Sequence, residues 1–488
     1  MSEQLRRTKI IATLGPATDQ PGAIDTLIAA GVNVVRLKFS HGTVEHHAQR
    51  VAAVRNAASR LGREVGVLGD LQGPKIRIEK FAEGKVLLKA GQGFVLDCRA
   101  DAAPGNVERI GCSYFGLVND VVAGDTLLLD DGLIALKVLA VEGCEIRTEV
   151  LTDGQLSDRK GLNRLGGGLS LGALSDKDRE DIKHAAALGV DFIAVSFCRS
   201  AEDINEARAL AHAAGSEAGF VAKVERAEAI VNLSEIIDAS DAVMVARGDL
   251  GVEIGDAELP GLQKKIIRET LERNKVVITA TQMLQSMVDN PIPTRAEVLD
   301  VANSVIDGTD AVMLSAESAS GLYPVKAVEA MVRICMGAER QFDHDTDFEA
   351  AKRGLSRTDE AIAMATMFLT EHIQVRAIIA MTESGGTARH LSRFRSAAPI
   401  YGLSRHPGAR RRMAMMRDVF PIDFDSRGLA PRKAAREAVK HLFQLGLLSA
   451  GDRVVITSGD HMEQHGSTNT LRILKVGQDG SAEGLGEL

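Results

Sequence analysis

The sequence predicts an α/β protein: a (β/α)8 TIM barrel with an inserted β-barrel-like lid domain and a C-terminal α/β domain. Two observations indicate the barrel. Eight short runs rich in β-branched residues recur along the chain, and helical patterns separate most of them. Eight such alternations predict a parallel barrel whose active site lies at the carboxyl ends of the strands. The runs are 9–15, 33–40, 65–70, 192–197, 220–225, 242–249, 276–282 and 311–318.

Helix start signals lie between several of these runs. Ser175 and Ser200 each precede an acidic residue by three positions, Asp178 and Asp203, which is the pattern of a capping box. Thr294 follows a proline and stands directly before the amphipathic segment RAEVLDVANSVI. Strand and helix signals therefore alternate in the order that a barrel requires.

One interval breaks this alternation and indicates a separate domain. From about residue 73 to 162 the chain reads as glycine-punctuated alternating strands such as KVLLK, with almost no helical periodicity. We interpret it as a β-rich lid inserted in the loop after the third strand. The polar linker FDHDTDFEAAKRG later leads to a second series of helices and strands. The predicted limits are 1–72 and 163–345 for the barrel, 73–162 for the lid and 346–488 for the C-terminal domain.

The composition limits the class of protein. A chain of 488 residues with 45% hydrophobic residues is long enough for roughly three domains. It has no apolar run near the roughly 18 residues of a membrane span, and its start, MSEQLRRTKI, lacks the apolar region of a signal peptide. A formal charge of -8 argues against a general nucleic-acid-binding protein. The five cysteines form no CxxC pair and suit a reducing compartment, so we expect a cytoplasmic protein without membrane or nucleic-acid partners.

Basic residues end the second strand, in VRLKFSHG. Alternation with a period of two places Arg36, Lys38 and Ser40 on one face of this strand. A cation at the carboxyl end of a barrel strand can receive a phosphate or a carboxylate group. The alternative is a structural arginine that pairs with an acidic residue at the rim.

Two neighbouring strands end in acidic residues. FVAKVERAEA places Lys223 and Glu225 on a common face, and VMVARGDLG likewise pairs Arg247 with Asp249. Two carboxylates at the barrel mouth can share a hard cation such as Mg²⁺ or Mn²⁺, and a lysine beside it can offset charge on a transferring phosphoryl group. Gly248 would let the backbone approach a ligand closely. The alternative is a purely structural ion pair of Lys223 with Glu225 or Asp249.

Hydroxyl groups follow the last two barrel strands. Thr281 lies in TATQ, and Ser315 and Glu317 lie in MLSAES. Hydroxyl groups at these strand ends can relay a proton to a substrate. Ordinary buried threonine and serine residues are the alternative explanation.

A possible anion site lies in the C-terminal domain, where TESGGTARH follows a predicted strand and opens a helix. Hydroxyl groups and glycines at a helix start can cradle a phosphate, and a plain helix cap is the alternative. The nearby HMEQH carries His461 and His465, to which we assign no metal because the segment is polar and flanked by glycine. The predicted cradle consists of Thr382, Glu383, Ser384, Gly385, Gly386 and Thr387.

Together these motifs resemble the pyruvate kinase family over essentially the whole chain. The matching segments, in that family's order, are KIIATLGPAT, NVVRLKFSHG, GDLQGPKIR, VAKVERAEA, VMVARGDLGVEIG, the stretch from TATQMLQSMV to SASGLYP, and the terminal GSTNTLRI. The resemblance implies transfer of phosphate from phosphoenolpyruvate to ADP, followed by protonation of enolpyruvate to pyruvate. It also implies a catalytic barrel, a lid, an effector-binding C-terminal domain and a homotetramer.

The resemblance further implies roles for single residues around the phosphoryl group. Arg36 would bind the substrate phosphate, and Lys223 would stabilise the phosphoryl group during transfer. Glu225 and Asp249 would hold Mg²⁺ against phosphoenolpyruvate.

The same resemblance assigns the remaining contacts of the two substrates. The Gly248 backbone and Thr281 would contact the carboxylate of phosphoenolpyruvate, and Ser315 would belong to the proton path. The nucleotide phosphates would be contacted by Arg77, Lys160 and His41.

The segment GDLQGPKIR departs from a common family pattern, DTKGPEIR, in which oxygens of an RxNFSHG motif and of the Asp-Thr pair hold K⁺. Here Leu71 follows Asp70, and Lys75 stands in place of the glutamate. The chain therefore resembles the K⁺-independent branch, in which the lysine ammonium takes the electrostatic role of the ion, and K⁺ is not expected to be required. A lysine in a solvated loop is the alternative.

Lys38 is a second departure, because the family usually has asparagine at this position. The change removes an oxygen ligand of K⁺ and adds a second ammonium near Arg36 and Lys75, and such crowding of like charges can lower a lysine pKa. The sequence leaves the direction of the Lys38 side chain open. The other positions of the former K⁺ site are Ser40, Asp70 and Leu71.

Two other functions fit the barrel pattern. A Mg²⁺-dependent lyase or aldolase acting through a pyruvate enolate would use similar groups, but the inserted domain favours a kinase because a second phosphate-bearing substrate needs a lid. A metabolite-sensing barrel without chemistry is disfavoured by the presence of Lys223, Glu225 and Asp249 together. Segment 382–387 has the position of the family's sugar-phosphate loop, so the predicted effector is a phosphorylated sugar or nucleotide.

Overall fold

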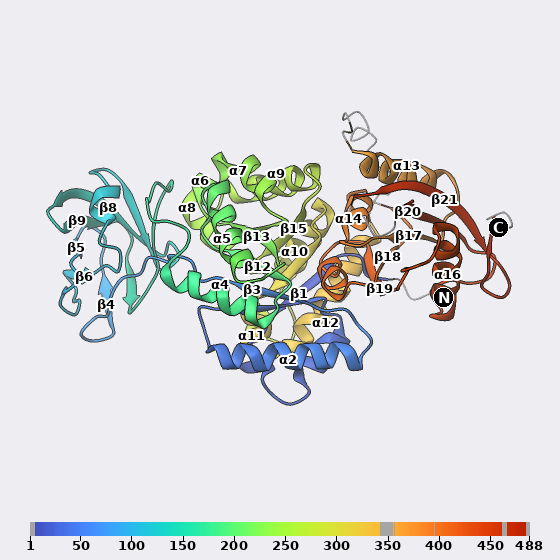
Figure 1. The fold of residues 1–488 in the computed structure, drawn as a ribbon. Coiled ribbons are helices and arrows are strands. Elements are labelled where there is room, and N and C mark those ends of the chain that lie inside the picture. Colours follow the sequence, from blue (N-terminus) through green and yellow to red (C-terminus); the bar gives the residue numbers. More distant parts are fainter. Residues whose placement is uncertain (1–4, 342–354, 356, 395, 461–465, 485–488) are drawn as a thin grey trace.

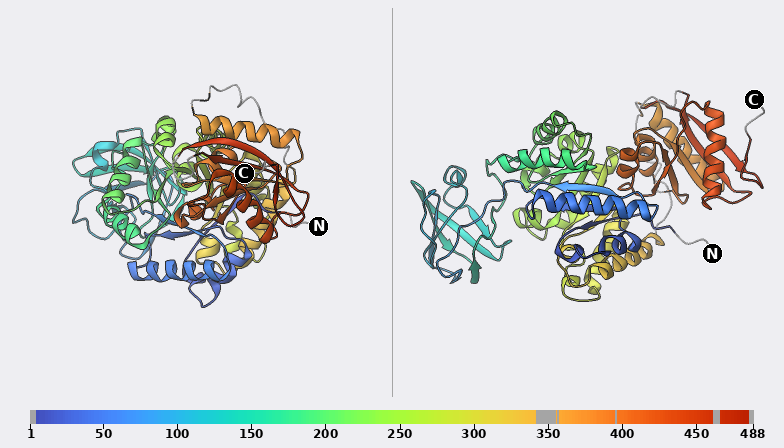
Figure 2. Two further views of the ribbon diagram at one scale, coloured as in Figure 1. Left: turned by 45° about the vertical axis from the view of Figure 1, so that its right-hand side comes forward. Right: turned by 60° about the horizontal axis from the view of Figure 1, so that its bottom comes forward.

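The protein consists of three parts in a row: a β-rich part, a central barrel and an α/β part (Figures 1 and 2). The computed structural model describes residues 5–341, 355, 357–394, 396–460 and 466–484. The predicted linker 342–354 and the histidines of 461–465 lie outside these residues. No helix among the described residues is both long enough and apolar enough to cross a membrane.

The central part is a closed barrel of eight parallel strands in the order β1-β16-β15-β14-β13-β12-β3-β2. Each of the eight predicted runs coincides with one of these strands to within a few residues at its ends, so the predicted barrel is confirmed. Every strand residue is buried except the last residue of β2, Lys38. The strands are β1 (Lys9–Thr13), β2 (Val34–Lys38), β3 (Gly66–Asp70), β12 (Phe192–Val195), β13 (Gly219–Val224), β14 (Ala242–Ala246), β15 (Val276–Ala280) and β16 (Ala311–Leu314).

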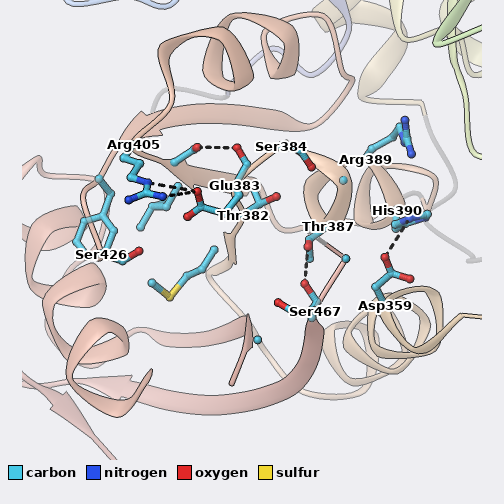
Figure 3. Close-up of a pocket in the computed structure, with 18 of the residues that line it drawn as sticks. Asp359, Thr382, Glu383, Ser384, Thr387, Arg389, His390, Arg405, Ser426 and Ser467 are labelled. Carbon is cyan, nitrogen blue, oxygen red and sulfur yellow. Dashed lines mark hydrogen bonds and ion pairs between the residues drawn. The ribbon is translucent and has the colours of Figure 1, made fainter. Parts of the chain in front are cut away.

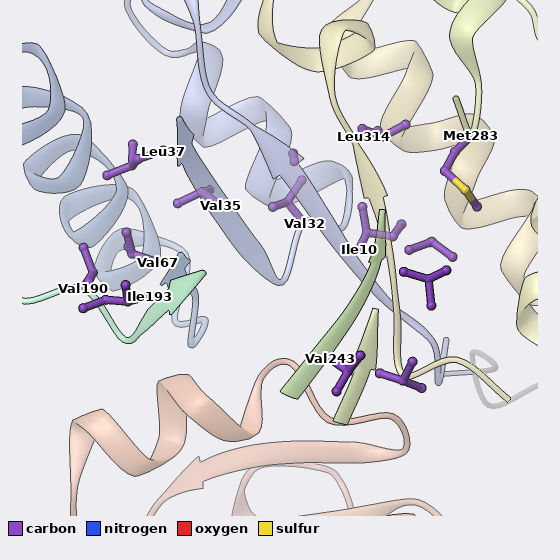
Figure 4. Close-up of a cluster of buried hydrophobic side chains, with 14 of the residues drawn as sticks. Ile10, Val32, Val35, Leu37, Val67, Val190, Ile193, Val243, Met283 and Leu314 are labelled. Carbon is purple, nitrogen blue, oxygen red and sulfur yellow. The ribbon is translucent and has the colours of Figure 1, made fainter. Parts of the chain in front are cut away.

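Helices surround the barrel and cover an apolar layer on the outer face of its strands. Val35, Val67 and Val243 belong to this layer (Figure 4), and burying each such side chain contributes roughly 1.5 to 3 kcal/mol. The helices of the barrel are η1 (Pro16–Thr18), α1 (Ala23–Ala30), α2 (Val44–Arg60), α4 (Asp176–Leu188), α5 (Ala201–Ala213), α6 (Ala227–Val231), α7 (Leu233–Ala239), α8 (Arg247–Ile254), α9 (Leu259–Glu272), η2 (Gln285–Val288), α10 (Arg295–Asp307), α11 (Ala316–Ala319) and α12 (Pro324–Glu339).

The predicted helix starts are confirmed. The Ser175 hydroxyl accepts from the Asp178 backbone N–H at 3.2 Å, and the Asp178 carboxylate accepts from the Ser175 N–H at 2.9 Å, directly before α4. The Thr294 hydroxyl accepts from the Glu297 N–H at 3.3 Å before α10. These caps satisfy N–H groups that lack partners at a helix start.

The predicted strand 242–249 is too long. β14 ends at Ala246, and α8 begins at Arg247, so Arg247 and Asp249 are not neighbours on one strand face. Gly248 has little strand propensity, and the Asp249 carboxylate in the first turn interacts favourably with the positive end of the helix. Likewise β16 ends at Leu314, and the residues after Ser315 form α11.

The inserted part is rich in strands, as predicted, and has its own apolar core that includes Phe94 and Leu136. Six strands form a sheet in the order β11-β7-β8-β9-β5-β6, and β10 pairs with β4 in a second sheet. The limits 73–162 stay a prediction. The elements are β4 (Lys85–Leu88), β5 (Gly93–Asp97), β6 (Arg109–Gly111), α3 (Leu117–Asp120), β7 (Thr126–Leu129), β8 (Ile134–Glu142), β9 (Glu145–Val150), β10 (Gly154–Ser157) and β11 (Leu162–Arg164).

The C-terminal part is the predicted α/β unit, built on a six-stranded sheet in the order β19-β18-β17-β20-β21-β22. Neighbours from β19 to β20 are parallel, and β21 and β22 are antiparallel additions. The elements are α13 (Thr358–His372), β17 (Ala377–Met381), α14 (Gly386–Ser392), β18 (Ile400–Ser404), α15 (Pro407–Met413), β19 (Val419–Asp423), α16 (Pro431–Gln444), β20 (Arg453–Gly459), β21 (Thr468–Val476) and β22 (Ala482–Glu483).

The C-terminal part packs against the amino ends of the barrel strands. Arg393 forms an ion pair with Asp310 at 2.5 Å, and Arg411 forms one with Asp191 at 2.7 Å. The buried Lys9 ammonium donates to the Val419 carbonyl at 2.6 Å. One apolar cluster joins barrel strands to this part, and the opposite, carboxyl end of the barrel stays free for a site. The cluster includes Ile11, Val34, Ile378 and Met413.

Candidate active site

Arg36 and Asp70 form a buried ion pair at the carboxyl end of the barrel. They lie on the neighbouring strands β2 and β3, and the Arg36 guanidinium contacts the Asp70 carboxylate at 2.6 Å through Nε and 2.5 Å through Nη2. Arg36 Nη1 also donates to the Thr13 hydroxyl at 3.0 Å. Burial alone would raise the pKa of Asp70, but Arg36 and Lys223 outweigh it and lower that pKa. Arg36 therefore has the acidic partner that the structural alternative described, and its role in binding phosphate stays a prediction.

Lys223 connects this pair to Glu225. Its ammonium lies 2.9 Å from Glu225 Oε1 and 3.3 Å from Asp70 Oδ1, and it donates to the Ser196 hydroxyl at 2.7 Å. Burial would lower the pKa of Lys223, but the two carboxylates outweigh it and raise that pKa. The predicted common face of Lys223 and Glu225 is confirmed, and the lysine stays charged within the barrel mouth.

Lys75 forms an ion pair with Asp249, with Nζ 2.9 Å from Oδ1. The Lys75 side chain is therefore partly buried and paired at the barrel mouth rather than free in a solvated loop, and its role in place of K⁺ stays a prediction. Arg247 turns away, because its guanidinium contacts Asp300 at 2.6 Å and donates to the Thr281 carbonyl at 2.7 Å. The expected pairing of Arg247 with Asp249 is therefore wrong, since the helix start rotates the two side chains apart.

Thr281 and Gly248 meet beside these charged groups. The Gly248 N–H donates to the Thr281 hydroxyl at 2.9 Å, and that hydroxyl donates to the Ala280 carbonyl at 2.6 Å. Thr281 has φ 68°, an uncommon left-handed conformation for a threonine, and such strain gathers at functional sites.

Ser315 and Glu317 follow β16 on the same end of the barrel. Glu317 is buried and accepts from the backbone N–H groups of Ser315 at 2.7 Å and Leu284 at 3.1 Å. Glu317 thus holds two loops together, and Ser315 is half-buried beside the mouth.

The three predicted nucleotide residues lie at the neck of the inserted part and on the loop after β2. Arg77 Nη1 donates to the Arg159 carbonyl at 2.8 Å, and Lys160 pairs with Asp130 at 2.8 Å. His41 Nδ1 lies 2.8 Å from the Ser40 hydroxyl. Burial and the charge of Lys38 lower the pKa of His41.

The positions that hold K⁺ in the common family pattern offer few side-chain oxygen atoms here. The Leu71 side chain is buried and apolar, and the Asp70 carboxylate already contacts Arg36 and Lys223. Ser40 lies in the turn after β2 rather than on the strand face with Arg36, because the strand ends at Lys38. The expected common face therefore holds for Arg36 and Lys38 alone.

Comparison with known proteins decides the family of this chain. Residues 5–328 match the model of the pyruvate kinase barrel domain, and residues 360–474 match that of the pyruvate kinase alpha/beta domain. The chain belongs to the pyruvate kinase family. It is therefore an enzyme of the phosphotransferase class.

Individual pyruvate kinases support this assignment over nearly the full length. Pyruvate kinase II of Salmonella typhimurium is 54% identical over 482 residues, which cover 98% of this chain and 100% of that protein. Pyruvate kinase of Haemophilus influenzae is 50% identical with the same coverage. The crystal structure of a pyruvate kinase from Cryptosporidium parvum superimposes with a TM-score of 0.90 at 34% identity and covers 96% of both chains.

The two carboxylates that a pyruvate kinase would offer to a divalent ion are Glu225 and Asp249. Burial raises the pKa of Glu225, and the negative charge of Asp249 adds to the effect while Lys223 opposes it. A cation beside both would relieve this repulsion, so the residues fit Mg²⁺. In the described part of the chain, no group of three or more His, Cys, Asp or Glu side chains is arranged to hold a metal. Further ligands would have to come from substrate and water.

The predicted phosphate cradle of this pyruvate kinase lines a cavity of about 350 Å³ in the C-terminal part (Figure 3). The loop joins β17 to α14, as predicted, and the Thr382 hydroxyl accepts from the Gly385 N–H at 3.0 Å. Gly385 has φ 92°, which favours glycine. The Thr387 hydroxyl lies 2.6 Å from that of Thr468, whereas Ser384 is exposed.

Sequence reasoning missed several residues that hold these sites together. Ser196 bonds Lys223, and Thr13 bonds Arg36. Both could have been found, because each lies at the carboxyl end of a predicted barrel strand. Arg405 and His406, which contact Glu383 at 3.2 Å and 2.5 Å in the C-terminal cavity, follow a different strand and had no local signal.

Proposed function

We propose that this enzyme transfers phosphate from phosphoenolpyruvate to ADP, giving pyruvate and ATP in glycolysis. The observation that carries the proposal is the buried cluster of Arg36, Asp70, Lys223 and Glu225 at the carboxyl end of the barrel, with the Lys75–Asp249 pair beside it. Phosphoryl transfer needs fixed cations around a phosphate rather than a covalent intermediate. This cluster supplies such cations without any cost of rearrangement.

In this proposal Arg36 binds the phosphate of phosphoenolpyruvate, and Lys223 stabilises the charge of the phosphoryl group during transfer. Both cations are held by buried carboxylates, so they are in place before substrate arrives. Such preorganised donors typically contribute about 3 to 4 kcal/mol of transition-state stabilisation each.

Mg²⁺, or Mn²⁺ in its place, would be held by Glu225 and Asp249. A bound divalent ion would neutralise phosphate charge and orient the substrate oxygens. The Gly248 backbone and the Thr281 hydroxyl contact the carboxylate of phosphoenolpyruvate. Their mutual hydrogen bond, which holds the two groups side by side, supports this shared role. Ser315 takes part in the path that delivers a proton to the enolate.

ADP binds between the barrel and the inserted part, which acts as a lid. Arg77 and Lys160 at the neck of the lid and His41 on the barrel contact its phosphates. The closeness of Arg77 and Lys160 supports this, because the Ile78 N–H donates to the Lys160 carbonyl at 3.0 Å.

The enzyme works without K⁺, because the Lys75 ammonium provides the charge. The 2.9 Å pair with Asp249 and the absence of a side-chain oxygen at Leu71 support this role. A tethered ammonium at about 4 Å from a phosphate, at an effective dielectric of 20, interacts by roughly 4 kcal/mol, as a bound K⁺ would.

A phosphorylated sugar or nucleotide binds the cavity whose lining includes Thr382, Glu383, Ser384, Gly386 and Thr387, and it activates the enzyme. Its volume of about 350 Å³ and its lining of hydroxyl groups and arginines support an anionic ligand of this size. We further propose that the protein is a cytoplasmic homotetramer, by analogy with its family.

An initial-rate assay with phosphoenolpyruvate, ADP and Mg²⁺ tests the proposal. Pyruvate formation should require ADP and should be unchanged by KCl at constant ionic strength. Pyruvate-enolate chemistry without ADP would instead indicate a lyase or aldolase. Binding of phosphoenolpyruvate with no turnover would indicate a sensor.

A further inference from the structure

Lys38 differs from the other residues of the barrel strands in its exposure to solvent. It is the last residue of β2 and the one exposed residue of the eight barrel strands, all of which are described in full. Arg36 lies on the same face of the strand, two residues earlier, which corresponds to roughly 6.6 Å along the strand. Lys38 therefore lies closer than Arg36, the proposed phosphate-binding residue, to the open carboxyl end of the barrel. The lid is attached at this end.

Three other cations of the barrel mouth each have a carboxylate partner. Arg36 pairs with Asp70 at 2.5 Å, Lys223 with Glu225 at 2.9 Å, and Lys75 with Asp249 at 2.9 Å. Among the described residues, none forms a hydrogen bond or ion pair with the Lys38 ammonium within the usual distance limits. Lys38 thus brings one positive charge that no protein carboxylate neutralises at close range.

The charged groups near Lys38 include residues proposed to bind phosphoenolpyruvate and a residue proposed to bind ADP. Desolvation and the charge of Arg36 lower the pKa of Lys38, with further lowering by Lys223 and Lys75 and opposition from Asp70. Lys38 in turn lowers the pKa of His41, one of the candidate nucleotide contacts. The Lys38 charge is therefore close enough to act both on groups proposed to hold the donor phosphate and on His41 at the proposed nucleotide side. An incoming anion would relieve this crowding of like charges.

We propose that Lys38 binds the β-phosphate of the nucleoside diphosphate that accepts the phosphoryl group. The inference rests on the proposed function. During transfer the bond between phosphorus and the enol oxygen breaks, a bond from a β-phosphate oxygen to that phosphorus forms, and the enolate takes up a proton to give pyruvate. The β-phosphate must therefore approach the phosphate held by Arg36 and Lys223 from the open side of the barrel, where Lys38 stands. Lys38 is thus a further substrate-binding residue, specific for the acceptor.

The test compares Lys38→Met and Lys38→Arg with the parent enzyme and with Lys183→Met, which removes a 58% exposed lysine on α4. For each protein, kcat and both KM values are measured at saturating Mg²⁺, and ADP and AMP are titrated calorimetrically. We expect Lys38→Met to raise the KM for ADP and weaken ADP binding about 10- to 100-fold. The KM for phosphoenolpyruvate should change less than about threefold, Lys38→Arg should restore most of the ADP affinity, and Lys183→Met should match the parent.

Three results would overturn the inference: unchanged ADP affinity in Lys38→Met, an equal or larger effect on phosphoenolpyruvate, or an equal loss of AMP binding, since AMP lacks the β-phosphate. Failure of the proposed function would look different. In that case the parent enzyme itself would form no pyruvate from phosphoenolpyruvate and ADP.

Discussion

Lys75 and Asp249 are 174 residues apart in sequence, yet their side chains meet at 2.9 Å at the mouth of the barrel. The contact joins the segment that leads into the lid to the first turn of α8. It thus places a tethered ammonium group beside one of the two candidate metal-binding carboxylates.

Lys75→Met should lower the rate at least tenfold, because the variant loses a unit charge that interacts with substrate phosphate by roughly 4 kcal/mol before solvent screening. The parent enzyme should be equally active in KCl and in tetramethylammonium chloride at the same ionic strength. Initial rates in the two salts check this expectation. Strong stimulation of the parent enzyme by KCl would contradict the role of Lys75.

Lys223→Met should lower kcat by about a thousandfold, because a preorganised charge-stabilising donor is lost from the transition state. Since the change also leaves Glu225 and Asp70 with fewer partners, thermal unfolding must be followed in parallel to show that the variant is folded. Steady-state kinetics give the result. Near-normal turnover of a folded variant would remove Lys223 from the mechanism.

The combined changes Thr382→Ala and Ser384→Ala should abolish activation by a phosphorylated sugar or nucleotide while leaving the basal rate within about twofold. The two hydroxyl groups lie in the C-terminal cavity, on the far side of the barrel from the proposed chemistry. Rates with ribose 5-phosphate, fructose 1,6-bisphosphate and AMP measure the response. If the variant responds like the parent to an effector that activates the parent, the loop is only a helix cap.

Lys9→Met should change how stability depends on pH. Burial and the nearby charge of Arg6 lower the pKa of Lys9 to about 7, with Arg63 adding to the effect and Asp418 and Glu339 opposing it. The unfolded chain keeps the ordinary lysine pKa, so between about pH 7 and 10 the unfolded state binds more protons. Lys9 therefore makes the free energy of unfolding rise with pH in this window, by at most roughly 1.4 kcal/mol per pH unit.

Urea unfolding of parent and Lys9→Met between pH 6 and pH 9.5 measures this effect. The difference in unfolding free energy between the two proteins should shift in favour of the parent as the pH rises. The Lys9→Met change also removes the hydrogen bond to the Val419 carbonyl. The test therefore uses the change with pH of the difference in unfolding free energy, and not its value at a single pH. A difference that is constant across the range would show that Lys9 keeps its charge on folding.

The barrel could be predicted from the sequence because its signal is local and repeated. Runs such as AVML (311–314) are buried on both faces in the structure and therefore form continuous apolar stretches in the sequence. The capping residues Ser175 and Thr294 could also be predicted, because a helix cap involves residues that are close in sequence.

Contacts between residues far apart in the sequence could not be predicted in this way. The pattern around Arg247 and Asp249 suggested a strand, but the chain turns into α8 at Arg247 and sends the two side chains to different partners. The direction of Lys38 and the contacts of Glu383 with Arg405 depend on how separate strands are arranged in space. No periodicity in one sequence encodes such distances.

The apolar cluster that contains both Ile11 and Met413 has a consequence for how the molecule comes apart. Because barrel and C-terminal sheet share one interior, neither can lose its structure without exposing the other, and the two should melt in a single calorimetric transition. The lid encloses Phe94 and Leu136 in an interior of its own, so it should give rise to a separate, smaller heat-absorption peak.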